Sequence, residues 1–465
     1  MSFPPGLKAP VIWQMLSWIV QPFTLMERCA QRYGDCFSLA LSTKFPPMVL
    51  VSAPEALQHL LSSDNGKDFD VPGELNEIFE PLLGSQSVLG LGGEPHRRMR
   101  QLMMPPFHGE RMRSYSQLMG EITQTVIGTW SVGQNIDVHA AMQSISMRVI
   151  LSAVFGVEVG SRYQRLEQLL AKMLNDMGSS LGASMLYFRS LRQDWGSWSP
   201  WGNFLRTREQ IDQIIYAEIA DRRAHPNPER QDILTLLMSA QDETGAGLTD
   251  EELRDELMTL LVAGHETTAT ALTWAMYWLH KLPDVRTHLR SELQNLEDLE
   301  DVNALLRLPY LNAVCSETLR IHPVGILTFP RVVRTPVAIA GHTLDPGTII
   351  LGCIYLAHRC ESVYPQPEQF RPERFLERQF SPYEYLPFGG GARRCIGMAF
   401  AQFEMKVVLA HILSEVELSL ANSKPARPIR RGLTAGASPV HLRVEGFIPV
   451  IPRPRTVTSA RLHSP

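Results

Sequence analysis

Amphipathic spacing of apolar residues dominates the chain between residues 96 and 238, and it predicts a series of helices. The next helix begins at a capping box, because Thr249 is followed three residues later by Glu252. From there to about His280 the sequence is apolar on several faces, which is typical of a helix that passes through a core. A last helical pattern runs from residue 396 to about residue 418. Helices therefore make up most of the predicted fold.

Short apolar segments separated by turn residues predict a minor sheet. These segments are Phe37–Leu41, Met48–Val51, Arg331–Val333, Val337–Ala340 and Thr348–Leu351. Residues 66–95 are punctuated by glycine and proline and predict a long loop. We therefore expect a mainly α fold with a minor β region, in a single large helical domain. Within it we expect a lead-in at 1–25, sheet contributions from 26–62 and 325–360, and a tail at 446–465.

Composition agrees with one globular unit. The 465 residues are 44% hydrophobic and 20% charged, and no low-complexity linker divides them. A formal net charge of −4 argues against nucleic acid as a partner. The apolar stretch at 11–20 is too short to cross a bilayer and contains Gln14 and Ser17. We expect a cytoplasmic monomer with at most peripheral membrane contact, through Trp13, Leu16, Trp18 and Ile19.

One cysteine differs from the other five. The six cysteines form no C-x-x-C pair, so neither a zinc site nor a disulfide framework is indicated. Cys395, however, stands in the stretch Phe388–Gly397, framed by glycines and followed by a helix start. Backbone N–H groups and the positive end of that helix favour a thiolate, which suits an axial ligand to heme iron. The plainer interpretation is a glycine-rich turn around a buried structural cysteine.

The pattern Phe-x-x-Gly-x-Arg-x-Cys-x-Gly resembles the heme-binding loop of the cytochrome P-450 family, and three further motifs follow the family's order. They are Ala263–Thr268, the Glu-x-x-Arg at Glu317–Arg320, and Pro372–Phe375. The resemblance implies heme b (iron protoporphyrin IX) as cofactor, with Cys395 as the iron ligand and Phe388 and Gly397 shaping the loop. It also implies a structural network of Glu317, Arg320 and Arg374.

The remaining site residues have expected roles in proton delivery and heme binding. Glu266 and Thr267 form an acid–alcohol pair that suits proton delivery to bound oxygen. In addition, Thr267 is expected to bond to a carbonyl and open the helix locally. Two heme propionates require several cations. The resemblance implies that these are His96, Arg100, Arg331 and Arg393.

The resulting prediction is a monooxygenase that inserts one atom of O₂ into a hydrophobic molecule of fatty-acid or terpenoid type. The resemblance is to a soluble bacterial member, similar to cyanobacterial fatty-acid oxidisers. Electrons are expected from a separate ferredoxin or flavodoxin with its reductase. The candidate docking cations are Arg97, Arg98, Arg100, Arg359, Arg394 and Lys406. A heme-thiolate peroxygenase or isomerase, and a non-enzymatic heme-based ligand sensor or carrier, remain alternatives.

An apolar, methionine-rich pocket lining favours a flexible hydrophobic substrate. The candidate lining residues are Phe69, Leu75, Phe79, Met177, Met185, Phe188, Leu327 and Phe329.

Overall fold

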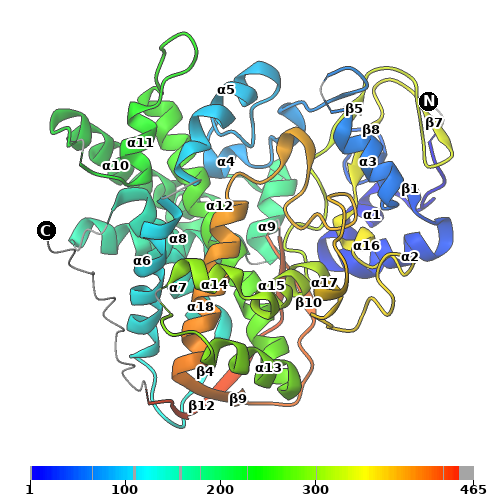
Figure 1. The fold of residues 1–465 in the computed structure, drawn as a ribbon. Coiled ribbons are helices and arrows are strands. Elements are labelled where there is room, and N and C mark those ends of the chain that lie inside the picture. Colours follow the sequence, from blue (N-terminus) through cyan, green and yellow to red (C-terminus); the bar gives the residue numbers. More distant parts are fainter. Residues whose placement is uncertain are drawn as a thin grey trace, which may run out of the picture.

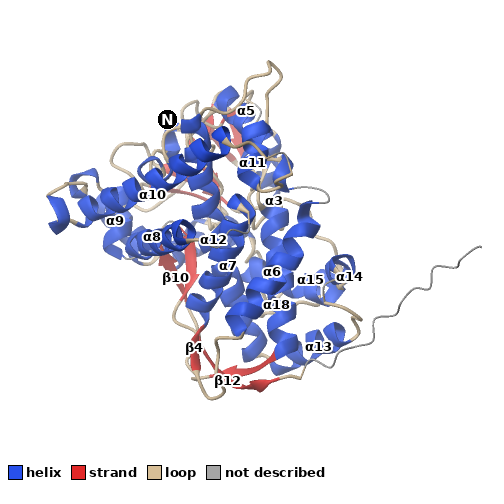
Figure 2. Cartoon of the chain, turned by 90° about the vertical axis from the view of Figure 1, so that its left-hand side faces the viewer, coloured by secondary structure: helices blue, strands red, loops and turns tan. Residues whose placement is uncertain are grey.

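Helices account for most of the computed structural model, and the molecule is roughly triangular in outline (Figures 1 and 2). The structure describes residues 3–449 except 65, 108–110, 157–159, 179, 228, 300 and 433. The predicted tail therefore lies largely outside the described residues.

The chain up to Lys281 supplies most of the longer helices. The α-helices of this part are α1 (Val11–Val20), α2 (Pro22–Tyr33), α3 (Pro54–Ser62), α4 (Glu80–Leu83), α5 (Gly93–Met103), α6 (Arg111–Ile127), α7 (Val138–Phe155), α8 (Ser161–Gly178), α9 (Ser180–Tyr187), α10 (Pro200–Ala224), α11 (Ile233–Ser239) and α12 (Asp250–Lys281). Short 3₁₀ helices connect them at η1 (Glu74–Asn76), η2 (Pro105–Phe107), η3 (Arg189–Leu191) and η4 (Gly196–Trp198).

The last third of the chain carries the remaining helices and most of the strands. Its helices are α13 (Pro283–Gln294), α14 (Val302–Arg307), α15 (Pro309–Ile321), α16 (Ile354–Ala357), α17 (Arg374–Glu377), η5 (Gly391–Arg393) and α18 (Met398–Glu415).

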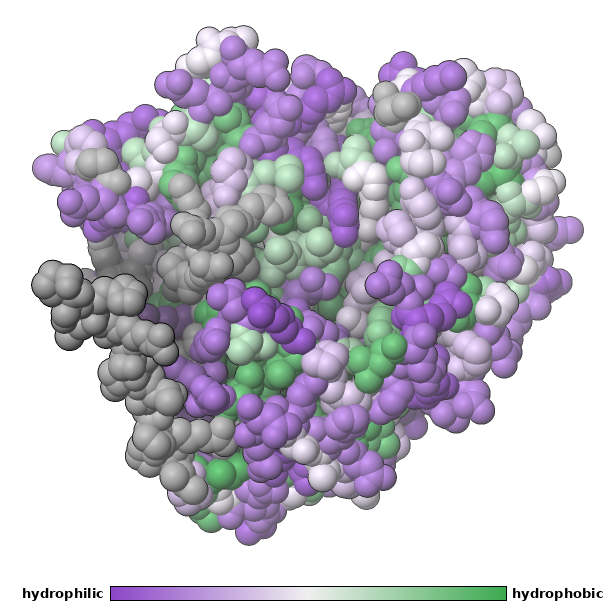
Figure 3. Space-filling model, viewed as in Figure 1, coloured by the Kyte–Doolittle hydropathy of each residue, from purple (hydrophilic) through white to green (hydrophobic). Residues whose placement is uncertain are grey.

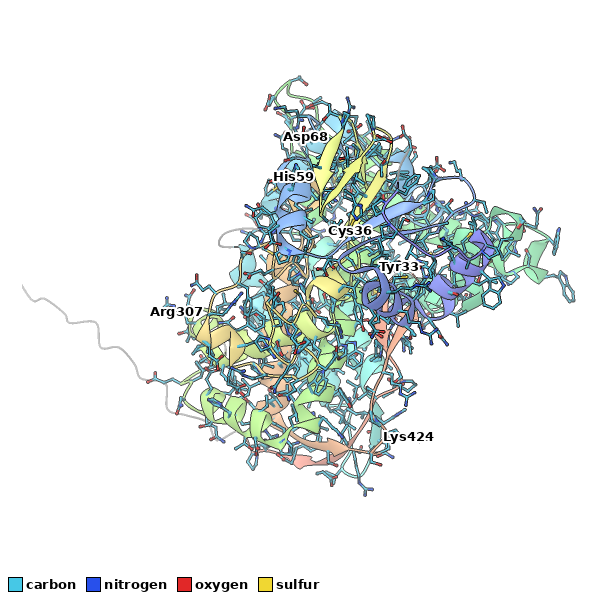
Figure 4. All side chains as sticks on the ribbon, turned by 90° about the vertical axis from the view of Figure 1, so that its right-hand side faces the viewer. Tyr33, Cys36, His59, Asp68, Arg307 and Lys424 are labelled. Carbon is cyan, nitrogen blue, oxygen red and sulfur yellow. The ribbon has the colours of Figure 1, made fainter. Side chains whose placement is uncertain are left out.

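A five-stranded sheet joins early and late segments of the chain. Its order is β1 (Cys36–Leu39), β2 (Met48–Val51), β8 (Ile349–Gly352), β5 (Arg331–Val333) and β3 (Phe69–Asp70). Strand β2 runs parallel to β8, whereas the other pairs are antiparallel. The sheet lies with α1, α2 and α3 at one side of the molecule (Figure 1). Figure 4 shows Cys36, His59 and Asp68 in this part, away from Arg307 and Lys424.

Smaller sheets complete the β structure. One contains β4 (Asn135–Asp137), β12 (His441–Phe447) and β9 (Val416–Leu420) in that order. Two hairpins pair β10 (Pro428–Arg431) with β11 (Thr434–Ala437), and β6 (Val337–Ile339) with β7 (His342–Leu344). The strands predicted near residues 37, 48, 331, 337 and 349 are thus confirmed. The predicted loop at 66–95 is partly wrong, because it contains β3, η1, α4 and the start of α5.

Helix α12 crosses the middle of the helical part, as its apolar pattern predicted (Figure 1). Both bonds of the predicted capping box are present between Thr249 and Glu252. The most extensive helix contact of α12 is with α7. At Gly264 this packing is so close that an added Cβ would lie 3.1 Å from the Cδ1 atom of Ile150. Glycine therefore sets the distance between the two central helices.

Two helices are relevant to whether the protein spans or contacts a membrane. Among the described residues, α7 is long and apolar enough to span a bilayer, but 72% of it is buried inside the molecule, as in a core helix. Helix α1 exposes four apolar side chains: Ile12, Trp13, Leu16 and Val20. The prediction for Trp18 is wrong, because this side chain is buried against the hairpin residue Arg430.

Candidate active site

The segment around Cys395 forms a tight reversal just before α18. Two of its glycines, Gly389 and Gly391, have positive φ angles of 67° and 65°, which side chains rarely adopt. The amide of Cys395 donates to the carbonyl of Phe388 at 3.0 Å and so closes the loop. An added Cβ at Gly390 would lie 2.8 Å from Leu61 of α3. The glycines therefore permit both the turn and its close packing on α3.

The sulfur of Cys395 faces a cavity. The side chain is exposed because it borders this cavity, although protein atoms otherwise surround it. Burial raises the pKa of the Cys395 thiol. The backbone N–H of Gly397 and the positive charges of Arg100 and Arg394 act in the opposite direction and favour the thiolate. The pKa remains raised on balance, and the Gly397 amide and these two charges are the groups that would favour a thiolate ligand.

The cavity measures about 330 Å³ and lies between the cysteine loop and α12. Its walls are mostly apolar and include Val88, Leu89, Leu260, Ala263, Val324 and Phe400. Figure 3 shows a hollowed apolar area near the centre of one face, bordered by polar side chains. Such a lining excludes water and suits a flat hydrophobic group or a hydrophobic substrate.

Four predicted donors border the same cavity: His96, Arg100, Arg331 and Arg393. Burial and the nearby guanidinium groups lower the pKa of His96 to about 3. Burial, followed by the charges of Arg331 and Arg100, lowers the pKa of Arg393 to about 10. The Nε atoms of Arg331 and Arg393 are buried and have no hydrogen-bond partner among the described residues. No described carboxylate lines the cavity.

This excess of donors indicates an anionic partner. Asp64 outside the lining pairs with Arg331, but no described carboxylate of the lining balances Arg100 and Arg393, and negative groups within reach would reduce the cost of burying these charges. Two propionates on a flat macrocycle meet this requirement, while the apolar walls suit its faces. The residues present therefore fit a heme with the Cys395 sulfur toward its iron.

Asp64, at the C-terminal side of α3, is a site residue that the sequence did not reveal. It accepts hydrogen bonds from Arg331 Nη2 at 2.7 Å and from the Ala392 amide at 3.0 Å. Arg331 also donates to the carbonyl of Gly390 at 3.0 Å. Asp64 thus joins β5 to the cysteine loop. No motif marks it, because its role depends on which distant segment lies opposite.

Helix α12 presents two threonines to the cavity. Thr267 donates its hydroxyl to the carbonyl of Ala263 at 2.6 Å, and Thr268 donates to Gly264 at 2.9 Å. The predicted back-bond of Thr267 is therefore confirmed. The predicted opening of the helix is wrong, because α12 remains helical through this region.

Glu266 does not line the cavity but points toward α7. Its Oε2 accepts from Gln143 Nε2 at 2.7 Å, and its Oε1 lies 3.3 Å from His139 Nε2. Burial alone raises the pKa of Glu266, but His139 and Gln143 outweigh that effect and leave the pKa lowered. The acid and the alcohol are adjacent in sequence, yet their side chains lie on different faces of α12. A proton passing between them needs an intermediate carrier.

The predicted network behind the cysteine loop is confirmed. Arg320 donates to both carboxylate oxygens of Glu317, at 2.7 and 2.9 Å, and Arg374 donates to one of them at 3.0 Å. All three side chains are buried. Arg320 also donates to the carbonyl of His358. The network therefore ties α15 to the segments that lead into the loop.

Only part of the predicted substrate lining borders the cavity. Leu327 and Phe329 do, and Phe79 packs on Phe329 with ring centroids 6.2 Å apart. Phe69 is fully buried on β3 instead. Leu75, Met177, Met185 and Phe188 are not among the residues that line the cavity.

The predicted docking cations differ in how accessible their side chains are to a partner protein. Arg394 is exposed, and Arg97 is exposed beside Glu94. Arg98 is instead engaged by Asp242 and Glu252. The other three predicted cations are also unsuited to docking. Arg359 is mostly buried, Lys406 is partly buried with a pKa lowered by burial, and Arg100 borders the cavity.

A helical body whose cysteine loop opens into an apolar, cation-bordered cavity is the arrangement of a heme-thiolate protein. The family model Cytochrome P-450 matches residues 4–444. Cytochrome P-450 135B1 of Mycobacterium tuberculosis and Mycobacterium bovis is 36% identical over 429 residues, covering 92% of this chain and 88% of that protein. Cytochrome P-450 138 of Mycobacterium tuberculosis is 33% identical over 432 residues, covering 92% and 93%.

Solved structures share the fold. Retinoic-acid-bound cyanobacterial CYP120A1 matches with a TM-score of 0.80 at 24% identity, covering 96% of this chain and 100% of that one. The heme domain of cytochrome P-450DA matches with a TM-score of 0.81 at 23% identity, covering 96% and 98%. The chain belongs to the cytochrome P-450 family. It is a monooxygenase of bacterial type whose cofactor is heme bound through a thiolate.

Proposed function

We propose that the enzyme oxidises a hydrophobic molecule of fatty-acid or terpenoid type, held in the cavity between Cys395 and α12. The observation that carries this proposal is the composition of the cavity, with apolar walls, the Cys395 sulfur on one side and the hydroxyl of Thr267 on the other. A substrate rich in C–H bonds gains free energy by leaving water for such a space.

When bound, heme supplies oxygen activation and the transfer of one oxygen atom to the substrate. The chain's own residues have separate tasks. Cys395 is the proposed iron ligand, and Phe388 and Gly397 shape the loop around it. His96, Arg100, Arg331 and Arg393 are the proposed partners of the propionates, and they would hold the cofactor in the cavity.

Thr267 and Glu266 are proposed to deliver protons. Thr267 holds a hydroxyl at the cavity wall, anchored on the Ala263 carbonyl. Glu266 holds its carboxylate against His139 and Gln143 on the other side of the helix. We therefore assign Thr267 to the cavity end of the route and Glu266 to the end nearer α7. The apolar walls keep bulk water away from the reacting centre.

The electron donor in this proposal is a ferredoxin or flavodoxin with its reductase, docking near the exposed Arg394 on the cysteine side. We also propose a cytoplasmic, monomeric enzyme. The mostly buried α7 is compatible with this location.

Replacement of the cysteine tests the site. In Cys395→Ser the reduced CO complex should lose the thiolate-type Soret band, because a hydroxyl does not supply the same axial charge. Cys360→Ser is the matched control, since that cysteine is half-buried and does not border the cavity. Retention of the thiolate-type band in Cys395→Ser would contradict the assignment.

Substrate class is tested by the heme spectrum. Fatty acids of increasing chain length and terpenoid acids such as retinoic acid are titrated into the ferric enzyme, and the Soret shift is followed. Compounds that shift the band are then incubated with O₂ and a ferredoxin system. Oxygenated product supports the proposal, whereas reversible gas binding without product would support a ligand sensor.

A further inference from the structure

We propose that Glu256 of α12 is a positioning residue, whose buried carboxyl group holds residues 84–92 in place and thereby shapes the cavity wall and the setting of Arg393. We call residues 84–92 the wall loop. This inference rests on the heme site proposed above. It concerns how the protein shapes that site, and not which group binds the iron.

Side chains of α12 hold the wall loop and the residue before it. The wall loop itself contains no helix or strand, and part of its backbone bonds to partners elsewhere. Four side chains within two turns of α12 bond to the wall loop or to Leu83, three of them through backbone atoms and one through the Ser87 hydroxyl. The bonds are Arg254 Nη1 to Leu83 O (2.9 Å), Gln86 N to Asp255 Oδ2 (2.8 Å), Val88 N to Glu256 Oε1 (2.6 Å) and Ser87 Oγ with Thr259 Oγ1 (2.7 Å).

The opposite side of the wall loop faces the active site. Val88 and Leu89 line the cavity. The carbonyl of Val88 accepts from Arg393 Nη1 at 2.8 Å, and the carbonyl of Leu91 accepts from Arg393 Nη2. A shift of Val88 therefore changes the apolar wall and the support of a proposed propionate partner together. Glu256 contacts neither the substrate space nor the proposed cofactor, so it acts through Val88.

Glu256 is the innermost of these anchors. Its side chain is fully buried, and its bond to the Val88 amide is buried at both ends. Its second carboxyl oxygen has no hydrogen-bond partner among the described residues. Burial, followed by the nearby charges of Asp255 and Glu252, raises the pKa of Glu256 well above its usual value. A neutral carboxyl group therefore accepts the hydrogen bond of the Val88 amide, and a glutamine at position 256 should accept the same bond.

The test uses heme-loaded wild type and the variants Glu256→Leu, Glu256→Gln and Glu251→Gln. Glu251 is an exposed carboxyl on the same helix and serves as the control. Each protein is titrated with imidazole, which is small, and with 4-phenylimidazole, whose ring reaches the cavity wall. Transfer of heme to apomyoglobin is measured as a second readout. The reduced CO spectrum checks the thiolate ligand separately, so failure of the heme assignment is distinguishable.

In Glu256→Leu the lost amide partner should weaken 4-phenylimidazole binding about fivefold and speed heme loss by a similar factor. Imidazole affinity should stay within about twofold, because this probe does not need the wall. In Glu256→Gln and Glu251→Gln the affinities for both probes and the rate of heme loss should stay within about twofold of the wild-type values. A general loss of stability would weaken the binding of both probes alike. The ratio of the two affinities therefore separates an effect on positioning from an effect on stability.

Two results would overturn the proposal: an unchanged affinity ratio in Glu256→Leu, or a Glu256→Gln variant as impaired as Glu256→Leu. If Glu256→Leu does not take up heme, Ser87→Ala replaces it. This milder change removes another anchor of the wall loop and should move the ratio in the same direction by about twofold. An unchanged ratio there would equally refute the proposal.

Discussion

Glu404 is a buried carboxyl group whose protonation should make the stability of the folded protein depend on pH. It lies on α18, nine residues after the cysteine, with an exposed fraction of 0%. Neither carboxyl oxygen has a hydrogen-bond partner in the described part of the chain. Burial raises the pKa of Glu404 from 4.5 to about 8, and nearby Ser146 offsets only part of that rise. The carboxyl group is therefore protonated in the folded protein at neutral pH.

The raised pKa of Glu404 determines how its ionisation changes the stability of the protein with pH. Because the folded pKa lies above the unfolded value, the bound proton stabilises the fold, fully below about pH 4.5 and no longer above about pH 8. At about 1.4 kcal/mol per pKa unit, wild type should lose about 3 kcal/mol between about pH 5.5 and about pH 8.5 from this group. Glu404→Gln keeps the shape, stays neutral and avoids that loss.

Thermal unfolding measures the difference. With an unfolding entropy of about 2 cal/mol/K per residue, 3 kcal/mol corresponds to roughly 3 °C for a chain of this length. The melting temperature of Glu404→Gln relative to wild type should therefore rise by about 3 °C from the lower to the higher pH. Glu251→Gln, which changes an exposed carboxyl, should show no such trend. A relative melting temperature that does not change with pH would refute the reasoning for Glu404.

Three further predictions concern the network, the proton route and the electron donor. Glu317→Gln removes the buried negative charge between two arginines and should lower the free energy of unfolding by about 3–5 kcal/mol, whereas an unchanged urea midpoint would contradict this. Thr267→Ala should still bind heme and consume electrons but release more of them as peroxide; a peroxide yield equal to that of wild type would exclude Thr267 from proton delivery. Reduction by a ferredoxin should slow with rising salt, because charges more than about 8 Å apart are screened. Arg394→Glu should slow it at low salt with heme retained, and indifference to both changes would place the donor elsewhere.

Local signals explain which elements the sequence predicts correctly. The capping box at Thr249 and the apolar pattern after it depend on residues within one helix, and α12 begins as predicted. The end of α18 depends on distant residues instead. A helix predicted to about residue 418 stops at Glu415, because Val416 pairs with Phe447 of β12. Within the region predicted as helices, residues 135–137 likewise form a strand, paired with residues more than 300 positions away.

The same distinction applies to the site. The motif around Cys395 is a local pattern, and the family resemblance implied His96 and Arg100 as site residues; all three border the cavity. The direction of Glu266 and the role of Asp64 were not predictable, since neither follows from neighbours in sequence. Asp64 matters because Ala392, 328 positions further on, lies opposite it.

The distribution of the cavity walls along the chain has a consequence for biosynthesis. Lining residues extend from Val88 to Thr434, with α12 between them. A ribosome releases the chain from its N-terminal end, and non-local contacts form only after both partners have emerged. The pocket is therefore incomplete until synthesis has passed Thr434, so we expect cofactor capture to follow synthesis of α18 and β11.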